Sequence, residues 1–418
     1  MQAVILAAGE SSRFWPLSEN SHKGLFSLLG RPIIAHTLAA LRRAQIEEIV
    51  IVQSPDCLLE SALGDGSRWG VKLSYVVQPE PRGMGDALRC AHALLRERFL
   101  VLNPQHINCD LVIPRLIEFD DAPAVLVGCP TERPHEYGIL KLDGDRAVDL
   151  TEKPAPGTEP SRTRVAGIYL LSKSFFDFYR QTPEHPYAFE ETLRAMMRTH
   201  SVRVLQIDQE PPTLKYPWDL FPLVQLLMER EITEQKIAPT AQIHKSALIE
   251  GPVWIGEHTR VLEHAVIKGP CYIGDRCVIG TGSLVRDCSN LEEGTVIGAH
   301  AEVARSIFQK NCSTHSGYFG DSIFGESVKI GAGTVTANVR NDRRTIRPTV
   351  KGQRVETGLY KLGAIVGRET HIGISAMLMP GVLIGPRCEI GPGTMVLQNV
   401  ESDTRYYAKP AQIISQRK

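Results

Sequence analysis

An aliphatic residue recurs at every sixth position through the second half of the chain, and this repeat constrains the fold more than any other feature. One unbroken run consists of Ile243, Ile249, Ile255, Val261, Ile267, Ile273, Ile279, Val285, Leu291, Ile297 and Val303. A second run consists of Val366, Ile372, Leu378, Ile384, Ile390 and Val396. A period of six fits neither an α-helix nor a simple hairpin, and it is typical of a parallel β-helix in which each hexad forms one side of a coil. We expect these side chains to stack inside the prism.

Glycine often follows the aliphatic residue, as in Ile255-Gly256 and Ile273-Gly274, and we expect it to permit the backbone corner. The repeat is interrupted at 304–323 and again at 337–365. Insertions in a solenoid become outer loops, where function often lies, so we predict a loop at each interruption. The alternative is that both are tolerated decoration.

Residues 1–235 alternate short β-rich runs with amphipathic stretches. The β-rich runs lie at 3–8, 49–53, 74–78, 99–103, 124–128 and 165–171. The amphipathic stretches lie at 33–43, 86–96 and 219–231. This alternation predicts βαβ units and a mostly parallel sheet covered on both faces. The fold class is therefore α/β over 1–235, followed by a parallel β-helix over 236–418.

Charge and cysteine content exclude several classes of protein. The 47 basic and 47 acidic side chains cancel, which argues against an electrostatic nucleic-acid binder. The nine cysteines include no CxxC pair, which indicates a reduced, cytoplasmic protein without structural zinc. The apolar start of the chain is too short to span a membrane, so we expect no membrane association.

A glycine-containing turn follows the first expected strand, in the sequence AAGESSRF, and Lys23 lies shortly after it. Backbone N–H groups at a strand's carboxyl end, together with Arg13 and Lys23, form a suitable cradle for phosphates. A plain tight turn is the alternative reading.

LAAGESSR followed by HKGLFSLLGRP resembles the opening signature of sugar-1-phosphate nucleotidylyltransferases. QPEPRGMGDAL, EYGIL with TEKP, AGIY and YPWDL match further family segments in order. HSGYFGDS, GAGTVTANVRND and KLGAIVGRETHIG are similar to the acetyltransferase half of bifunctional N-acetylglucosamine-1-phosphate uridylyltransferase/glucosamine-1-phosphate acetyltransferases, especially the archaeal branch. The resemblance covers nearly the whole chain. It implies a Rossmann-like nucleotidyltransferase domain followed by a left-handed β-helix.

In the first domain, the resemblance implies in-line attack of a sugar phosphate on the α-phosphorus of a nucleoside triphosphate, with a pyrimidine preference. The implied nucleotide-binding residues are Leu6, Ala7, Ala8, Gly9, Arg13, Lys23, Gln78 and Gly83. Gly138 and Glu152 would hold the sugar.

The first domain departs from the family where Mg²⁺ should bind. Gln105 stands at one expected acidic position and Thr213 near the other, and neither supplies the anionic oxygen that Mg²⁺ prefers. Other departures are Ser11, Met84 and Val165. Asp110 is a weak candidate to replace the missing acid. We assign no metal ligand and predict weak or no nucleotidylyl transfer; the alternative is that the family tolerates these changes.

In the second half, His315 matches the family's general base, which deprotonates a sugar amine as it attacks the thioester of acetyl-CoA. Arg286, Tyr318 and Asn338 match sugar-binding residues, with Arg286 on the sugar phosphate. Cations that would hold phosphates of the sugar or of acetyl-CoA are Arg340, Arg344, Lys351 and Lys361. An expected lysine is Ala304 and an expected asparagine is Lys329, so the acceptor sugar is left open.

The prediction is an acetyl-CoA-dependent N-acetyltransferase acting on an amino-sugar phosphate, with a degenerate nucleotidylyltransferase domain. One alternative is a fully bifunctional enzyme that also makes a UDP- or dTDP-sugar. The other is a catalytically silent protein that binds nucleotide sugars. The partners are small molecules, and the family implies a homotrimer.

Overall fold

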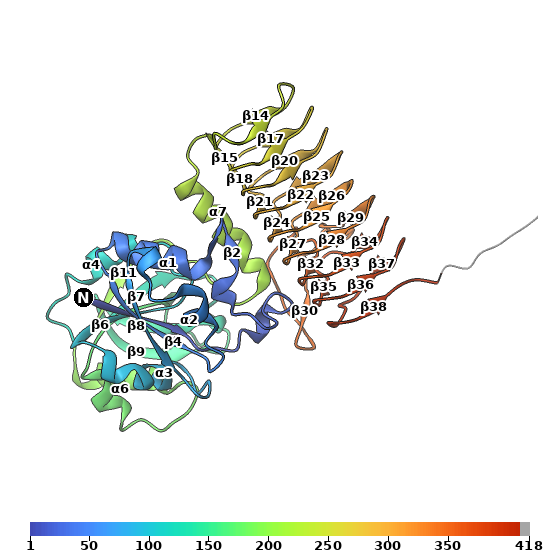
Figure 1. Ribbon diagram of the computed structural model, residues 1–418. Coiled ribbons are helices and arrows are strands. Elements are labelled where there is room, and N and C mark those ends of the chain that lie inside the picture. The colour runs from blue at the N-terminus through green and yellow to red at the C-terminus, as the bar shows by residue number, and fades with distance from the viewer. Residues whose placement is uncertain (410–418) are drawn as a thin grey trace, which may run out of the picture. The chain divides into compact units, whose positions relative to one another are not determined.

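The computed structural model describes residues 1–409, which form two compact units. The first contains Met1–Glu10 and Pro32–Thr213; the second contains Ser11–Arg31 and the residues from Leu214 onward. Figure 1 shows an α/β fold and a stack of short parallel strands, which confirms the predicted α/β fold and left-handed parallel β-helix. No helix among residues 1–409 is long and apolar enough to cross a lipid bilayer.

The first unit is built on a nine-stranded sheet. Its order is β5 (Lys72–Val77), β4 (Glu48–Gln53), β1 (Gln2–Ala7), β6 (Arg98–Leu102), β10 (Thr163–Ser172), β7 (Ala124–Pro130), β11 (Val202–Gln206), β9 (Arg146–Glu152) and β8 (Gly138–Asp143). Strands β5, β4, β1 and β6 are parallel, and so are β7 and β11.

The rest of this sheet is antiparallel, so the prediction of a mostly parallel sheet was wrong. Strand β10 runs against both β6 and β7, and β8 and β9 form a hairpin. Gly144 takes a φ of +59° in the two-residue hairpin turn, a conformation that suits glycine. The Asp-Gly pair at this turn is the sequence signal that the strand–helix alternation concealed.

Helices cover the sheet where their apolar residues recur at helical spacing. The α-helices are α1 (Ile33–Arg43), α2 (Leu58–Leu63), α3 (Met84–Ala91), α4 (Ile113–Leu116), α5 (Phe175–Tyr179) and α6 (Ala188–Thr199). In α6, Phe189, Leu193 and Met196 are fully buried against the core that contains the inner face of the sheet. This helix was absent from the predicted elements, although its spacing is amphipathic.

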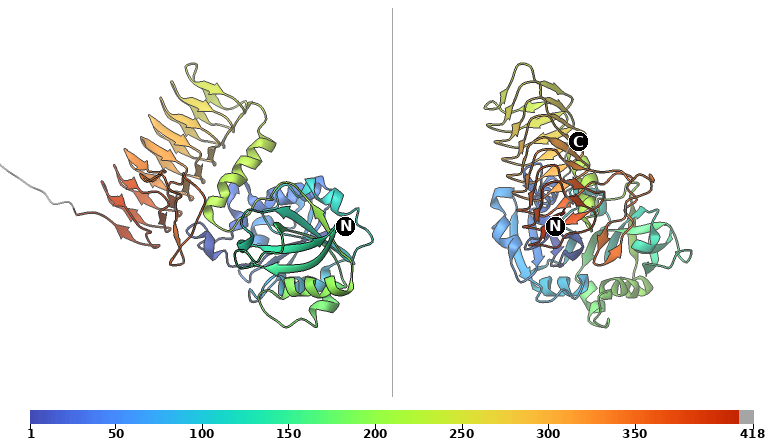
Figure 2. Two further views of the ribbon diagram at one scale, coloured as in Figure 1. Left: turned by 180° about the vertical axis from the view of Figure 1, so that it is seen from behind. Right: turned by 90° about the vertical axis from the view of Figure 1, so that its right-hand side faces the viewer.

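The β-helix has three faces of parallel strands. Figure 2 shows the stack of coils along its length. The first face contains β12 (Lys236–Ile237), β15 (Val253–Ile255), β18 (Cys271–Ile273), β21 (Asn290–Leu291), β24 (Ile307–Phe308), β27 (Ile323–Phe324), β32 (Ile365–Val366) and β35 (Leu383–Ile384). The second contains β13 (Gln242–Ile243), β16 (Arg260–Val261), β19 (Val278–Ile279), β22 (Val296–Ile297), β25 (Ser313–Thr314), β28 (Lys329–Ile330), β33 (His371–Ile372), β36 (Glu389–Ile390) and β38 (Arg405–Tyr406). The third contains β14 (Leu248–Glu250), β17 (Val266–Lys268), β20 (Leu284–Arg286), β23 (Ala301–Ala304), β26 (Gly317–Gly320), β29 (Thr334–Thr336), β34 (Met377–Leu378) and β37 (Met395–Val396).

The repeated aliphatic residues form the core of the prism, as predicted. From Ile255 to Val303 every member of the first run is buried, whereas Ile243 and Ile249 in the first coil are partly exposed. The glycines that follow them have a different role from the expected one. A Cβ on Gly280 would lie 2.6 Å from the backbone carbon of Gly298, so glycine is required by the close approach of successive coils rather than by backbone freedom.

Only the second interruption of the repeat is an outer loop. Residues 337–364 leave the prism and include the hairpin of β30 (Thr349–Val350) and β31 (Gln353–Arg354). The first interruption is a shortened coil. Val303 pairs with Phe319 and Phe308 with Phe324, so one turn of the prism takes 16 residues here. The preceding turn, from Val285 to Val303, takes 18. The prediction of a loop there was therefore wrong.

The segment 11–31 belongs to the second unit and is hydrogen-bonded to the first face of the prism. It contains β2 (Ser27–Leu28), which pairs with β3 (Arg31–Pro32). The Leu29 N–H donates to Asn290 Oδ1 at 2.9 Å. The amide of Gln309 accepts from the Ser27 N–H at 3.3 Å and donates to the Ser27 carbonyl at 2.8 Å. The same unit contains α7 (Leu220–Glu231).

Candidate functional site

Three neighbouring strands on the third face bring together the acetyl-transfer residues predicted from the sequence. Arg286 at the end of β20 is in register with Ala304 on β23, and Ala304 with Gly320 on β26. Tyr318 lies earlier on β26, and Asn338 follows β29 by two residues. The shortened coil therefore places these side chains on one surface.

Tyr318 and Asn338 contact each other directly. Asn338 Nδ2 donates to Tyr318 Oη at 3.1 Å and to Asp321 Oδ2 at 2.5 Å. A Cβ on Gly320 would come within 2.4 Å of Tyr318 Oη and 2.8 Å of Asn338 Nδ2. The two polar groups thus lie over a position where only glycine leaves space for them.

His315 lies in the turn between β25 and β26, three residues before Tyr318. Its backbone N–H donates to the Ile330 carbonyl at 3.2 Å, which fixes the turn to the next coil. The side chain is exposed, and its imidazole has no hydrogen-bond partner within residues 1–409. An exposed imidazole held by an ordered backbone is available to an incoming substrate.

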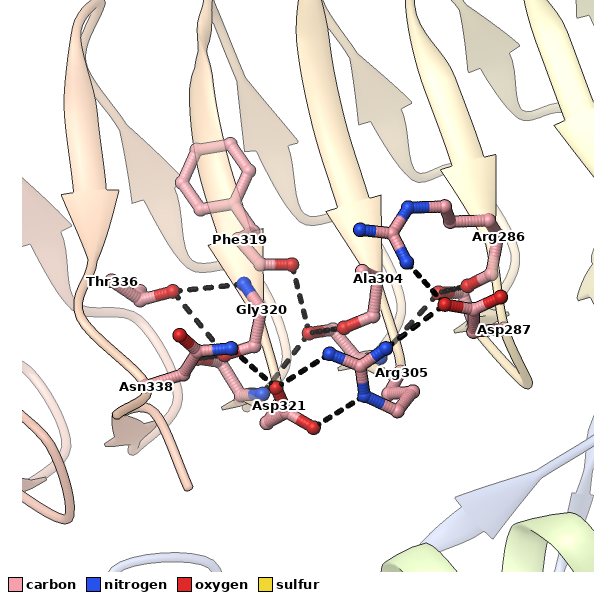
Figure 3. Close-up of polar contacts among 12 residues, drawn as sticks. Arg286, Asp287, Ala304, Arg305, Phe319, Gly320, Asp321, Thr336 and Asn338 are labelled. Carbon is pink, nitrogen blue, oxygen red and sulfur yellow. Dashed lines mark hydrogen bonds and ion pairs between the residues drawn. The ribbon is translucent and has the colours of Figure 1, made fainter. Parts of the chain in front are cut away.

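Arg286 is part of a charged network shown in Figure 3. It donates to Glu302 Oε1 from Nε at 3.0 Å and from Nη2 at 2.6 Å, and from Nη1 to Asp287. Arg305 lies between Asp287 and Asp321. The hydrogen bond from Arg305 to Asp321 raises the pKa of its guanidinium above the usual value.

The cations predicted to hold acetyl-CoA phosphates lie in the outer loop. Arg340 donates to both oxygens of Asp342 at 2.8 and 2.6 Å, and this contact lowers the pKa of the Asp342 carboxyl. Arg344, Lys351 and Lys361 are exposed. Arg340 is thus engaged locally, whereas the other three remain candidates.

In the first unit, the predicted nucleotide residues Leu6, Ala7, Ala8 and Gly9 occupy the carboxyl end of β1 and the residues after it. A Cβ on Gly9 would meet nothing within 4 Å, so the backbone there borders open space. Gln78 is buried, and its Nε2 donates to the Gly83 carbonyl at 3.2 Å and to Asp86 Oδ2 at 2.8 Å.

The predicted sugar residues Gly138 and Glu152 are cross-strand partners on β8 and β9. A Cβ on Gly138 would lie 2.9 Å from Glu152 Oε2, so the glycine makes room for this carboxylate. The structure therefore brings this pair together.

Glu152 borders a cavity of about 350 Å³ whose other residues the sequence analysis missed. Lys153 Nζ lies 3.5 Å from Glu152 and donates to Tyr187 Oη at 3.2 Å. Glu190 also lines the cavity, and burial raises the pKa of its carboxyl to about 7. Lys153 is part of the TEKP motif, whereas nothing in the local sequence marks Tyr187 or Glu190.

The residues at the expected Mg²⁺ position do not fit that ion. Gln105 Oε1 is buried without a hydrogen-bond partner, and an amide oxygen carries no full charge. His106 beside it is fully buried, and burial with repulsion from Arg164 lowers the pKa of its imidazole to about 3. Asp110 makes an ion pair with Arg43 at 2.7 Å. Within residues 1–409, no cluster of three or more His, Cys, Asp or Glu residues could hold a metal ion.

The predicted phosphate-binding cations Arg13 and Lys23 lie in the segment 11–31 of the second unit. Lys23 Nζ donates to the Leu214 carbonyl at 2.9 Å, and Arg13 lies over the Tyr216 ring at 5.8 Å. Burial, together with the positive charge of Arg13, lowers the pKa of Lys23 to about 8. The Lys23 ammonium therefore loses its proton at a pH only slightly above neutral.

Comparison with known proteins agrees with this architecture. Residues 2–211 match the nucleotidyl transferase family, 249–341 match the GMPPB C-terminal domain, and 363–398 match six bacterial transferase hexapeptide repeats. The bifunctional protein GlmU of Methanocaldococcus jannaschii is 30% identical over 414 residues, which cover 98% of each chain. The bifunctional sugar-1-phosphate nucleotidylyltransferase/acetyltransferase of Sulfurisphaera tokodaii is 28% identical over 408 residues, 96% of this chain and 98% of that one. The chain therefore belongs to the nucleotidyl transferase family, in the branch of bifunctional transferases that join this domain to hexapeptide repeats.

Proposed function

We propose that the β-helix is an acetyl-CoA-dependent N-acetyltransferase for an amino sugar, and that the first domain has weak or no nucleotidylyltransferase activity. The observation that carries the first part is the exposed imidazole of His315 on the surface that also holds Tyr318 and Asn338. The resemblance implies an amino-sugar phosphate as acceptor. The contacts of Tyr318 and Asn338 support the amino-sugar part.

In the proposed step, the amine of the acceptor attacks the thioester carbonyl of acetyl-CoA. His315 takes one amine proton as the C–N bond forms, and it returns that proton to the sulfur as the C–S bond breaks, so that coenzyme A leaves as its thiol. Tyr318 and Asn338 offer a hydroxyl and an amide that can orient sugar hydroxyls. Arg344, Lys351 and Lys361 supply positive charge for the phosphates of coenzyme A.

Each unit keeps groups suited to one part of the nucleotidylyltransferase substrates. Gly138 and Glu152 in the first unit would hold a sugar ring, and Arg13 and Lys23 in the segment 11–31 of the second unit would neutralise a triphosphate. In-line transfer to the α-phosphorus needs strong charge neutralisation, which this family draws from Mg²⁺. The neutral Gln105 and the ion pair of Asp110 support the proposal that this step is weak.

Acetyl-CoA consumption and pyrophosphate release test the two parts separately in the full chain. We expect acetyl transfer to an amino sugar, and little pyrophosphate from UTP or dTTP with sugar 1-phosphates and Mg²⁺. Robust pyrophosphate release would favour the fully bifunctional alternative, which the names of the relatives also suggest. Nucleotide-sugar binding with neither turnover would favour the silent alternative.

Replacing His315 by Ala tests the proposed base. We expect kcat for acetyl transfer to fall by about 10²- to 10⁴-fold, with an unchanged midpoint of thermal unfolding because the side chain is exposed. His371→Ala, at another exposed histidine of the prism, is the matched control. Equal activity in the wild type and the His315 variant would contradict the assignment.

We also propose a homotrimer, because parallel β-helices with exposed flanks commonly associate. Light scattering coupled to size-exclusion chromatography would measure the mass. A monomer at micromolar concentration would contradict this proposal.

A further inference from the structure

Five charged side chains on the third face of the prism form a closed group, which we call the arginine–carboxylate cluster. Its members are Arg286, Asp287, Glu302, Arg305 and Asp321. Figure 3 labels all of them except Glu302. Two guanidinium groups meet three carboxylates, so the cluster carries a net charge of −1 when all five are ionised. Arg286 is the residue that the resemblance places on a sugar phosphate.

Both arginines use all their nitrogen atoms within the cluster. Arg286 donates from Nε and Nη2 to Glu302 and from Nη1 to Asp287. Arg305 donates from Nε and Nη2 to Asp321 at 2.6 and 2.9 Å, and from Nη1 to Asp287 at 2.9 Å. Each guanidinium keeps two N–H groups outside these bonds, but its charge is already balanced by two carboxylates, which compete with an incoming phosphate for it.

No other cation on this part of the face compensates. Ala304 and Gly320, in register with Arg286, offer a methyl group and a hydrogen atom. Lys268, on the other side of Arg286, is paired with Glu250 at 3.5 Å. From β14 to β29, every described cation of the third face therefore has a carboxylate partner.

We propose that the acceptor presents hydroxyl groups, not a phosphate ester, to the arginine–carboxylate cluster. The acceptor class is an amino sugar that is unphosphorylated at this end, and the proposal rests on the proposed acetyltransferase function. A phosphate monoester carries a charge of about −1.5 to −2 at pH 7, which a cluster of net charge −1 repels.

The outer carboxylates of the cluster suit sugar hydroxyls. The side chains of Asp287 and Glu302 are 44% and 35% exposed, so their oxygens can accept hydrogen bonds from a ligand. Tyr318 is in register with Glu302 across β23 and β26, and its neutral hydroxyl lies over Gly320 beside Asn338. The third-face surface next to Tyr318 is thus polar and anionic, whereas the exposed Lys329 lies on the second face, in register with Ser313.

The test compares glucosamine, glucosamine 1-phosphate and glucosamine 6-phosphate as acceptors, with acetyl-CoA consumption as readout. We expect kcat/KM for glucosamine to exceed that for either phosphate ester at least tenfold. The variant Asp287→Asn removes the negative charge of the carboxylate that both arginines share, and asparagine tolerates the φ of +56° at this position. It should lower the KM for glucosamine 1-phosphate about tenfold and raise the KM for glucosamine.

Glu389→Gln is the matched control, because it frees a cation, Arg405, on the second face of the prism and should change neither KM. A wild-type preference for a phosphate ester, or an unchanged KM for glucosamine 1-phosphate in Asp287→Asn, would overturn the proposal. Failure to acetylate any amino sugar would instead contradict the proposed function. If no amino sugar is acetylated, calorimetric binding of glucosamine 1-phosphate still tests the inference. Tighter binding by Asp287→Asn than by the wild type supports the inference. Tight wild-type binding that is abolished in Arg286→Ala overturns it.

Discussion

The structure lowers the pKa of Lys23 into a range in which its loss of charge can be followed experimentally. Its ammonium is buried beside Arg13 in the segment 11–31, and its pKa is lowered to about 8 from an ordinary value near 10.5. Such a lysine still carries its charge at pH 7, and it loses that charge at a pH at which most proteins remain folded. Its contribution to anion binding is therefore measurable by pH alone.

We expect the affinity of the full chain for UTP to fall roughly tenfold between pH 7 and pH 9.5, because Lys23 loses its proton as pH rises through about 8. UTP itself gains charge in this range, at the γ-phosphate and at uracil N3, so the effect of Lys23 is the difference between two pH profiles. Lys23→Arg keeps its charge throughout and should bind UTP with a much weaker dependence on pH. Isothermal titration measures both profiles. A steep pH profile that persists in Lys23→Arg would show that another group is responsible.

At the scale of elements, backbone hydrogen bonds set the spacing between coils of the β-helix, as from the Gly280 N–H to the Ile297 carbonyl at 2.7 Å. Glycines after the aliphatic residues fit the close approach at the corners, since a Cβ there would strike backbone atoms of the next coil. The left-handed corner conformation instead falls on residues such as His258, His264 and Arg276. The glycines therefore leave room for the next coil, and other residues make the turn.

Gly280→Ala should destabilise the prism by about 1–3 kcal/mol, because the new methyl group would lie 2.6 Å from the Gly298 backbone and force the coils apart. Urea unfolding followed by circular dichroism measures the change in free energy. Lys245→Ala, at an exposed corner, should leave the free energy of unfolding unchanged. An unaltered midpoint for Gly280→Ala would contradict the close-approach explanation.

At the scale of the whole molecule, the segment that carries Arg13 and Lys23 is held by side chains nearly three hundred residues further along the chain. Asn290 is fully buried and Gln309 nearly so, and both bond to backbone groups of residues 27–29. The prism thus holds the segment that contains both proposed phosphate-binding cations.

Gln309→Ala should cost about 1–3 kcal/mol of stability, because the Ser27 backbone loses both partners. It should also weaken UTP binding severalfold, while acetyl transfer is retained. Asn399→Ala is the matched control: its amide also joins two backbone segments, from the Leu383 N–H at 3.0 Å to the Thr349 carbonyl at 2.8 Å. We expect a similar loss of stability there without a change in UTP affinity. Equal UTP binding by both variants would show that Gln309 does not position the loop.

The candidate site was predictable where its residues lie in short motifs. His315 and Tyr318 share a turn and strand, and Gly138 and Glu152 face each other across one hairpin. One partner of Arg286 was not predictable, since Glu302 becomes its neighbour only when coils stack, whereas Asp287 follows Arg286 directly in the chain. For a charged side chain on one coil, the sequence does not show which charge on another coil pairs with it until the register of the coils is known.

The amino-acid sequence by itself determined the two fold types, because a six-residue aliphatic period and a strand–helix alternation each bury apolar surface in only one economical way. It also determined the loss of acidic groups at the expected Mg²⁺ position. Only the tertiary structure decided that the first interruption is a shortened coil, that the sheet is mixed, and that the segment 11–31 is held by the prism. These features depend on hydrogen bonds and close contacts between residues far apart in the chain, which leave no local pattern in the sequence.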